Sequence, residues 1–546
     1  MNHKQRLELT WIGKDQRPRL EPRILLEDPE KSYHAKTRIT EGDIFDNRLI
    51  FGDNLLALKA LEQDYAGKVK CVYIDPPYNT GSAFEHYDDG MEHSIWLSLI
   101  RARLEILWKL LDKTEGSIWI SIDDSEMAYL KVLCDELFGR RSFIACNIWQ
   151  KRYSRENREA IGDAHEYLLV YAKEPDVFKG IRNKLPLGEK QLSVYKNKNN
   201  DPKGPWRAVS FSAQGYRPNQ MYEIVSPYTG KRHRPPSGSC WKVIEDEYNR
   251  LLSEGRMFFG KDGNAVPSRI QYLKDIEGIV PWTWWPHDEV GHTDESKKEI
   301  QALFGKQDAF DTPKPERLIQ RIIQIATKPG DLVLDSFLGS GTTAAVAHKM
   351  HRRWIGVELG EHADTLCIPR LKKVIDGEDP GGVTSAVDWK GGGGFRYYRL
   401  APSLLEKDHW GNWVIAKDYN AAMLAEAVCK LMGFSYAPSE SEYWIHGRSS
   451  ETDYIYVTTQ SLTHEQLAAI SHEVGEERSL LVCCKAFRTN NLDAFPNLTV
   501  KKIPQTVLSK CEWGKDDYSL KVENLPMSAP PPEPPIAQPS LFGEGE

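Results

Sequence analysis

Short apolar runs alternate along this chain with stretches whose apolar residues recur every three or four positions. The apolar runs have the length and composition of strands buried in a sheet. They occur within 49–58, before a turn at Gly52-Asp53-Asn54, and at 69–75, 117–123, 331–337 and 354–359. Helical spacing, which indicates one buried face, occurs at 94–111, at 315–326 and after Gly341. This alternation predicts an α/β sheet.

Regular periodicity weakens between residues 151 and 310, where Pro, Gly, Trp, Tyr and Arg are frequent. Because strand and helix patterns resume after this region, we expect one sheet in two halves separated by an insertion. The halves are predicted at 47–150 and 311–388, and an N-terminal extension at 1–46 precedes them.

The rest of the chain has three predicted parts. Trp389, Lys390 and the four glycines that follow predict a flexible linker over 389–396. Residues 397–525 again alternate helix and strand patterns, which predicts a small α/β domain available for a partner. Residues 526–546 carry seven prolines, which predicts a disordered tail.

Charge is distributed unevenly. The whole chain has a net charge of −7, but residues 151–250 contain 19 Lys and Arg against 12 Asp and Glu, which gives this region +7 and leaves −14 elsewhere. A basic region in an acidic protein is typical of contacts with nucleic-acid phosphates. The candidate cations are Lys151, Arg152, Arg155, Arg158, Arg207, Arg217, Lys231, Arg232 and Arg234, and the aromatic residues among them are Tyr153, Trp206, Tyr216 and Tyr228.

A glycine turn, Gly339-Ser340-Gly341, separates the predicted strand at 331–337 from a helix, and the next strand ends at Glu358. Small residues let the backbone approach a ligand, and an acidic residue that closes the next strand can accept both hydroxyls of a ribose. The sequence therefore predicts a nucleoside pocket. Where a dinucleotide site would have a third glycine for pyrophosphate, this chain has the run that begins at Thr342. S-adenosylmethionine, which has no phosphate, suits this pocket better than NAD.

Asp75-Pro76-Pro77-Tyr78 lies at the carboxyl end of the strand predicted at 69–75, where α/β sheets place their ligand chemistry. The exocyclic amine of a base is a poor nucleophile, because its lone pair is delocalised into the ring. The carboxylate of Asp75 and the carbonyl of Pro76 can accept the two amine hydrogens and orient the lone pair toward a methyl donor. The prolines fix the direction of that carbonyl, and Tyr78 can stack on a base swung out of the duplex.

Together these motifs resemble the β-group amino-directed DNA methyltransferases, and specifically the modification (Mod) subunits of type III restriction-modification systems. The likeness covers about residues 47–375. The run DPPYNTG at 75–81 looks like the adenine-directed form of the catalytic motif. The catalytic motif precedes the glycine motif, as in the β group, with a recognition region between them.

The resemblance implies a Rossmann-like S-adenosylmethionine-dependent methyltransferase sheet, with 151–310 as the target-recognition region. It implies that Asp53, next to Asn54, contacts the cofactor adenine, and that Lys314 and Pro315 pack near the methionine end. Asp335 and Phe337 belong to the glycine motif, DSFLGSGTT, in which Leu338 stands where relatives commonly have alanine. The expected reaction is methyl transfer to adenine N6 of a flipped-out base, within a restriction-modification or phage-defence system.

Three other functions remain open. A cytosine-N4 DNA methyltransferase uses similar chemistry, although such enzymes often begin the catalytic motif with serine. An RNA or protein-glutamine methyltransferase usually carries the glycine motif first and lacks a long basic insertion. A non-catalytic DNA-binding subunit does not require Asp75 and the complete cofactor elements found here.

The expected partners are double-stranded DNA, a helicase-nuclease restriction subunit and a second copy of the chain. In the tail, Gln538, Ser540, Leu541 and Phe542 resemble the short peptide with which bacterial proteins bind the replication sliding clamp. The nine cysteines show no ligand spacing, so we expect no metal site and no disulfide framework. With no signal peptide or membrane-spanning apolar run, a cytoplasmic protein is expected.

Overall fold

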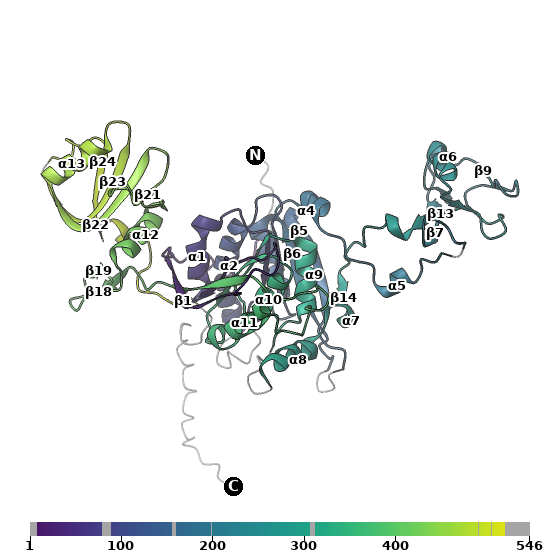
Figure 1. Ribbon diagram of the computed structural model, residues 1–546, viewed down its shortest axis with the longest axis horizontal. Coiled ribbons are helices and arrows are strands. Elements are labelled where there is room, and N and C mark those ends of the chain that lie inside the picture. The colour runs from purple at the N-terminus through teal and green to yellow at the C-terminus, as the bar shows by residue number, and fades with distance from the viewer. Residues whose placement is uncertain are drawn as a thin grey trace, which may run out of the picture. The chain divides into compact units, whose positions relative to one another are not determined.

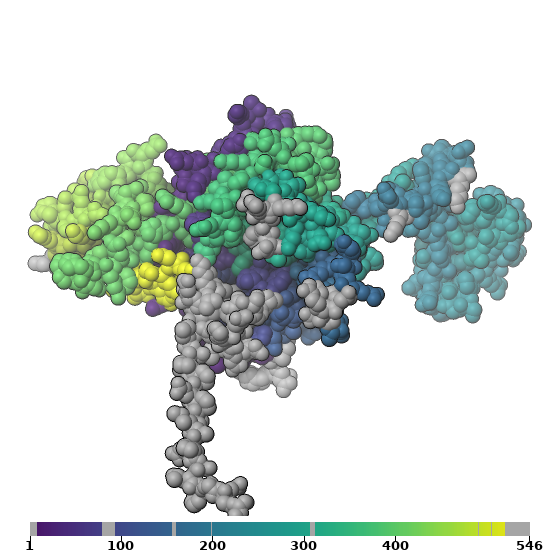
Figure 2. Space-filling model, turned by 90° about the horizontal axis from the view of Figure 1, so that it is seen from below, coloured from purple at the N-terminus to yellow at the C-terminus, as the bar shows by residue number. Residues whose placement is uncertain are grey.

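The computed structural model describes residues 8–78, 89–155, 160–197, 199–305, 312–489, 491–503 and 505–518. Two compact units are present. The larger extends through Arg182 and resumes at Thr283, and the smaller is Asn183–Trp282. The smaller unit forms a body of its own (Figure 2).

The larger unit is built on a ten-stranded sheet with the order β1-β17-β2-β16-β15-β3-β4-β6-β5-β14. The strands from β17 to β4 run parallel, whereas β1 pairs antiparallel with β17, and β6 pairs antiparallel with both β4 and β5. In sheet order the strands are Leu25–His34, Gly394–Leu400, Asn47–Phe51, Arg353–Glu358, Leu332–Asp335, Cys71–Ile74, Ser117–Ile122, His165–Ala172, Phe143–Gln150 and Trp284–Trp285. The fold class predicted from the sequence is confirmed.

The apolar composition of the central strands explains why they lie in the middle of the sheet. Every residue of β3, β4 and β15 is buried, as is typical of parallel strands covered on both faces. Strands β3, β15 and β16 are parallel neighbours, so their carboxyl ends lie at one edge of the sheet. This arrangement brings Asp75, Asp335 and Glu358 to that edge.

Two groups of helices contact this sheet (Figure 1). The first is α1 (Asn54–Tyr65), α2 (Asp89–Leu110) and α3 (Met127–Cys134), which share a core with alternate strand residues such as Val72 and Ile74. The second is α9 (Glu316–Ala326), α10 (Thr342–Lys349) and α11 (Ile368–Asp376). Because side chains alternate across a strand, these two groups can cover opposite faces.

The inserted unit is shorter than the region predicted at 151–310. Its bounds are Asn183–Trp282, because β6 is an interior strand of the main sheet, between β4 and β5, and not part of the insertion. Five consecutive buried residues, Leu168 to Ala172, explain why β6 joins the sheet. Also in the larger unit are α4 (Pro175–Ile181), α7 (His287–Val290) and α8 (Thr293–Phe304).

The inserted unit has small sheets around two aromatic cores. One core is built on Phe211, Trp241 and Phe259, and the other on Trp206, Ile270 and Tyr272. Its elements are α5 (Glu189–Leu192), β7 (Trp206–Ser210), β8 (Ser212–Gln214), β9 (Ile224–Val225), β10 (Arg232–His233), β11 (Ser239–Trp241), α6 (Glu245–Ser253), β12 (Met257–Phe258) and β13 (Ser268–Tyr272).

The glycine run is not the flexible linker expected over 389–396. Gly391 to Gly394 are buried, and Gly394 begins β17 of the main sheet. A Cβ on Gly392 would lie 2.6 Å from the Asp43 carboxylate, and one on Gly393 would lie 2.6 Å from the Ile44 carbonyl oxygen. Both glycines have positive φ, at 110° and 74°. The run therefore allows close packing of two backbones.

The C-terminal domain is a five-stranded sheet with the order β20-β21-β22-β23-β24. Helix α12 (Ala421–Met432) packs with Ile455 and Cys483, whereas α13 (His464–Val474) packs with Leu480 and Val482, so the helices cover opposite faces. The strands are Ser435–Tyr436, Gly447–Arg448, Asp453–Thr463, Ser479–Arg488 and Leu498–Lys502, with a hairpin of Leu405–Lys407 and Trp413–Ile415 before them and α14 (Gln505–Leu508) after them.

Within the described residues, no helix has both the length and the apolar character needed to cross a bilayer.

Candidate active site

Two adjoining cavities lie at the carboxyl ends of β3, β15 and β16. One has a volume of about 290 Å³ and the other about 370 Å³. Asp75, Pro77, Phe337 and Gly339 line both of them. A ligand in one cavity can therefore meet a ligand in the other beside the Asp75 carboxylate.

The smaller cavity, here called the nucleoside cavity, has the chemistry of a nucleoside site. Leu99, Ile100 and Val357 give it apolar walls, and Glu358 places a carboxylate among them. Of the predicted cofactor residues, Asn54, Phe337, Gly339 and Glu358 also line it.

Glu358 is held in place by the chain around it. Its Oε2 accepts a hydrogen bond from Gly339 N at 2.7 Å, and its Oε1 accepts from Leu359 N at 2.8 Å and Gly360 N at 2.9 Å. Burial alone would raise the pKa of Glu358, but His362 and these backbone donors lower it below the ordinary value. Glu358 therefore stays ionised as a hydrogen-bond acceptor.

The larger cavity, here called the base cavity, contains the predicted catalytic motif. Asp75, Pro76, Pro77 and Tyr78 line it together with Lys314, Asp335, Ser340 and Thr342. Burial raises the pKa of Asp335 to about 7.

Among the described residues, three of the predicted cofactor residues lie outside both cavity walls. Asp53 is buried, and its carboxylate accepts hydrogen bonds from Leu55 N and Leu56 N as the cap of α1, and from Tyr518 N at 2.9 Å. Pro315 caps α9. Gly341 caps α10 with a φ of 79°. All three position elements of the site.

Asp75 is at the centre of a partly buried polar network. Its Oδ1 accepts a hydrogen bond from the Tyr78 hydroxyl at 2.7 Å, and its Oδ2 accepts from Lys314 Nζ at 2.7 Å. A second carboxylate, Glu166, lies on the other side of both donors. Its Oε2 is 2.9 Å from the Tyr78 hydroxyl and 3.5 Å from Lys314 Nζ.

This environment sets the protonation of both donors. Burial by itself would lower the pKa of Lys314, but the carboxylates of Asp75 and Glu166 raise it above its ordinary value. Burial and the Asp75 carboxylate raise the pKa of Tyr78 well above its ordinary value. Lys314 is therefore charged and Tyr78 is a neutral hydroxyl at physiological pH.

The turn after β3 is fixed by a tryptophan of α2. Trp96 Nε1 donates to the Pro77 carbonyl at 2.8 Å, and Trp96 is fully buried. Because two prolines restrict the backbone before this bond, the Pro76 carbonyl has a defined direction.

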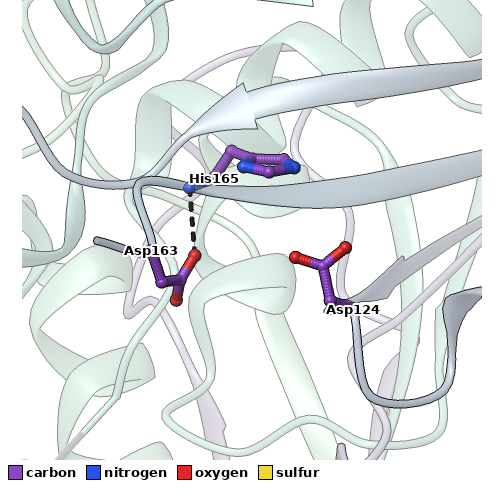
Figure 3. Close-up of side chains that lie close together, drawn as sticks. All are labelled: Asp124, Asp163 and His165. Carbon is purple, nitrogen blue, oxygen red and sulfur yellow. Dashed lines mark hydrogen bonds between the residues drawn. The ribbon is translucent and has the colours of Figure 1, made fainter. Parts of the chain in front are cut away.

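Three side chains offer possible metal ligands beside this site, namely Asp124, Asp163 and His165 (Figure 3). Both carboxylates already have partners, because Asp163 pairs with Lys151 Nζ at 2.6 Å and Asp124 accepts from the Tyr167 hydroxyl at 2.7 Å. We assign no metal to this cluster.

Comparison with known proteins agrees with this geometry. A family model described as DNA methylase matches residues 69–366, more than half of the chain. The chain belongs to the DNA methylase family. The match includes both catalytic-motif and glycine-motif segments and the whole inserted unit.

The chain is similar to individual type III and type II enzymes. The chain is 33% identical to the probable type III restriction-modification enzyme HindVI Mod subunit of Haemophilus influenzae, over 69% of this chain and 56% of that protein. It is 34% identical to the StyLTI Mod subunit of Salmonella typhimurium, over 62% and 55%. It is 31% identical to the type II methyltransferase M.KpnI of Klebsiella pneumoniae, over 59% and 81%. The chain thus spans little more than half the length of the two Mod subunits.

The sequence motifs described above include neither Glu166 nor Arg103. Glu166 is an acidic residue at the start of an apolar strand, and Arg103 is a cation inside an apolar helical pattern. A charged residue within an apolar pattern indicates that its side chain has a buried partner. In the structure, Arg103 lines the nucleoside cavity and donates to the Asn54 side chain at 2.6 Å and the Tyr518 carbonyl at 2.9 Å.

Proposed function

We propose that this chain is an S-adenosylmethionine-dependent DNA methyltransferase that modifies adenine N6 of a flipped-out base in double-stranded DNA. The observation that carries the proposal is the junction of the two cavities at Asp75, Pro77, Phe337 and Gly339. A nucleoside-type cavity that opens beside a hydrogen-bond acceptor for an amine is what methyl transfer to a base requires.

The residues of the nucleoside cavity fit S-adenosylmethionine. Its apolar walls suit an adenine ring, and Glu358 offers an anionic acceptor for ribose hydroxyls. Among the described lining residues, Arg103 is already bonded to Asn54 and to backbone carbonyls, and His362 pairs with Glu358 at 3.0 Å. Neither is placed to bind pyrophosphate, which argues against a dinucleotide. When bound, the cofactor supplies a methyl group on a positively charged sulfur.

The chain's own residues orient the acceptor. The Asp75 carboxylate and the Pro76 carbonyl accept the hydrogens of the exocyclic amine, so that its lone pair is directed away from the ring plane. Tyr78 stacks on the extruded base and limits its position. The released amine proton passes to Asp75 or to water.

A third cavity, of about 260 Å³, supports binding of the DNA backbone. Lys151, Arg152, Arg155 and Lys297 line it, and Tyr153 lies against the rings of His287 and His292 at its rim. Lys151 Nζ is 3.5 Å from Glu166 of the base cavity. Cations beside an extruded base can contact the flanking phosphates.

The inserted unit supplies further candidates for DNA contacts. Tyr216 and Tyr228 are exposed, and Arg232 and Arg234 are exposed cations that pair with Glu223. Trp206 instead belongs to a core, and Arg158 lies outside the described residues. We propose that 183–282 reads the target sequence, since it carries cations and exposed aromatic rings.

The test is base-modification sequencing of DNA from cells that express the wild type or Asp75→Ala. An N6-methyladenine mark at one short sequence in the wild type alone supports the proposal. No mark in either would overturn it. A mark on cytosine N4 would keep the chemistry and replace adenine by cytosine.

We further propose that the chain acts as the modification subunit of a restriction-modification or phage-defence system in the cytoplasm. The identity to two Mod subunits supports this role. A helicase-nuclease subunit and a second copy of the chain are the proposed protein partners. Co-purification with a helicase-nuclease encoded beside it, and the mass of the native assembly, test these two proposals.

The sliding-clamp peptide at Gln538, Ser540, Leu541 and Phe542 lies outside the described residues. It remains a proposal based on its sequence. Binding of purified clamp to the full chain and to a chain lacking 538–542 tests it, because unchanged affinity in the deletion would exclude this motif as the binding site.

A further inference from the structure

Each oxygen of the proposed catalytic carboxylate already accepts one hydrogen bond in this structure. Asp75 accepts the Tyr78 hydroxyl on Oδ1 and Lys314 Nζ on Oδ2, each at 2.7 Å. Methyl transfer as proposed above needs Asp75 to accept a hydrogen of the target amine as well. A cation at hydrogen-bond distance makes Asp75 a weaker acceptor and opposes the positive charge that develops on the methylated nitrogen. Lys314 must therefore find another partner when the base enters.

Glu166 is placed to become that partner. Its Oε2 faces both donors that Asp75 now holds, at 2.9 Å from the Tyr78 hydroxyl and 3.5 Å from Lys314 Nζ. A hydroxyl has one hydrogen, so Tyr78 can donate to only one of the two carboxylates at a time. The two carboxylates thus compete for the same donors.

The surroundings of Glu166 allow this exchange. Its other oxygen, Oε1, is 3.5 Å from Lys151 Nζ, and Lys151 has a closer partner in Asp163 at 2.6 Å. Lys314 Nζ also lies over the rings of Tyr78 and Trp149, at 5.1 and 5.9 Å from their centres. Aromatic faces attract a cation, so Lys314 can shift between the two carboxylates without losing favourable contacts.

We propose that Glu166 is a positioning residue for methyl transfer, which accepts Lys314 Nζ and the Tyr78 hydroxyl in place of Asp75 and so frees the Asp75 carboxylate for the target amine. This inference rests on the proposed function. Glu166 lies on β6, outside both the catalytic motif and the glycine motif, so the proposal gives a third segment of the chain a role in the reaction.

The experiment measures single-turnover methylation of unmethylated bacterial chromosomal DNA by the full chain at saturating labelled S-adenosylmethionine. Glu166→Gln removes the charge and keeps the shape of the side chain, and we expect it to lower the rate constant by about tenfold or more. Glu166→Asp keeps the charge and should recover part of the rate. Glu174→Gln, which changes an exposed carboxylate just beyond the other end of β6, is the matched control and should methylate as the wild type does.

Two readouts separate this role from a general loss of structure. Calorimetric binding of S-adenosylmethionine to Glu166→Gln should match the wild type, since Glu166 does not line the nucleoside cavity. In a Lys314→Met background no ammonium has to leave Asp75. Adding Glu166→Gln to that background should therefore lower the methylation rate constant much less than it does in the wild type. If Glu166 and Lys314 acted independently, the rate decrease in the double variant would be the product of the decreases in the two single variants.

The inference is overturned if Glu166→Gln methylates at the wild-type rate, or if its full effect persists when Lys314 is methionine. It is also overturned if Glu166→Asp is as slow as Glu166→Gln while both bind S-adenosylmethionine normally. A wild-type chain that methylates no DNA overturns the proposed function itself, which distinguishes that failure from failure of the role of Glu166.

Discussion

Replacing Glu358 by glutamine tests directly how much this residue contributes to cofactor affinity in the nucleoside cavity. Oε1 of Glu358 accepts from two backbone amides and faces His362, whereas Oε2 accepts from Gly339 N alone among the described residues. A carboxylate oxygen has two acceptor positions. One position on Oε2 is therefore left for a ribose hydroxyl of the cofactor.

The size of the effect follows from that single position. A hydrogen bond to a charged group contributes about 1.5–3 kcal/mol to stability. Loss of about 2 kcal/mol raises the dissociation constant of S-adenosylmethionine about thirtyfold. The amide group of glutamine also turns a donor toward one of the backbone N–H groups, which adds to the loss.

Titration calorimetry with purified full-length protein measures the dissociation constant. Glu361→Gln, an exposed carboxylate in the same loop, is the control and should bind as the wild type does. Thermal unfolding without cofactor shows whether the loop itself is weakened. If Glu358→Gln binds S-adenosylmethionine as tightly as the wild type, Glu358 does not contact the cofactor and the interpretation of this cavity is refuted.

Four further predictions concern the base cavity and the core. Tyr78→Ala should lower the methylation rate more than Tyr78→Phe, by about tenfold or more, because phenylalanine keeps a ring that stacks on the base; equal rates would exclude stacking. The affinity for the positively charged cofactor should rise as pH increases through about 7, because Asp335 ionises there. This rise should be absent in Asp335→Asn. If the rise persists in that variant, another group such as His362 causes it. The same raised pKa means that protonated Asp335 stabilises the folded state, and this stabilisation is lost as pH rises toward 7. Asp335→Asn should not show this pH-dependent loss of stability. Leu334→Ala, at a fully buried position of β15, should lower the free energy of unfolding by about 2–5 kcal/mol in urea titrations, whereas Leu508→Ala at an exposed position should change it little.

The amino-acid sequence by itself determined most of the regular structure. Residues 69–75, 117–123 and 354–359 were predicted as strands, and β3, β4 and β16 form there. Such predictions succeed because a buried strand or amphipathic helix is specified by its own residue spacing. The placement of Asp75, Gly339 and Glu358 at one edge followed in the same way, since each closes or follows a parallel strand.

Only the tertiary structure decided which distant residues complete the site. Lys314 is 239 positions from Asp75, and Glu166 is 88 from Tyr78, yet both meet these residues in the base cavity. The pairing of β6 with β4 brings Glu166 there, and no local pattern encodes that pairing. The glycine run shows the same limit. Four glycines permit both a flexible linker and close packing, and only the neighbours Asp43 and Ile44 select the second.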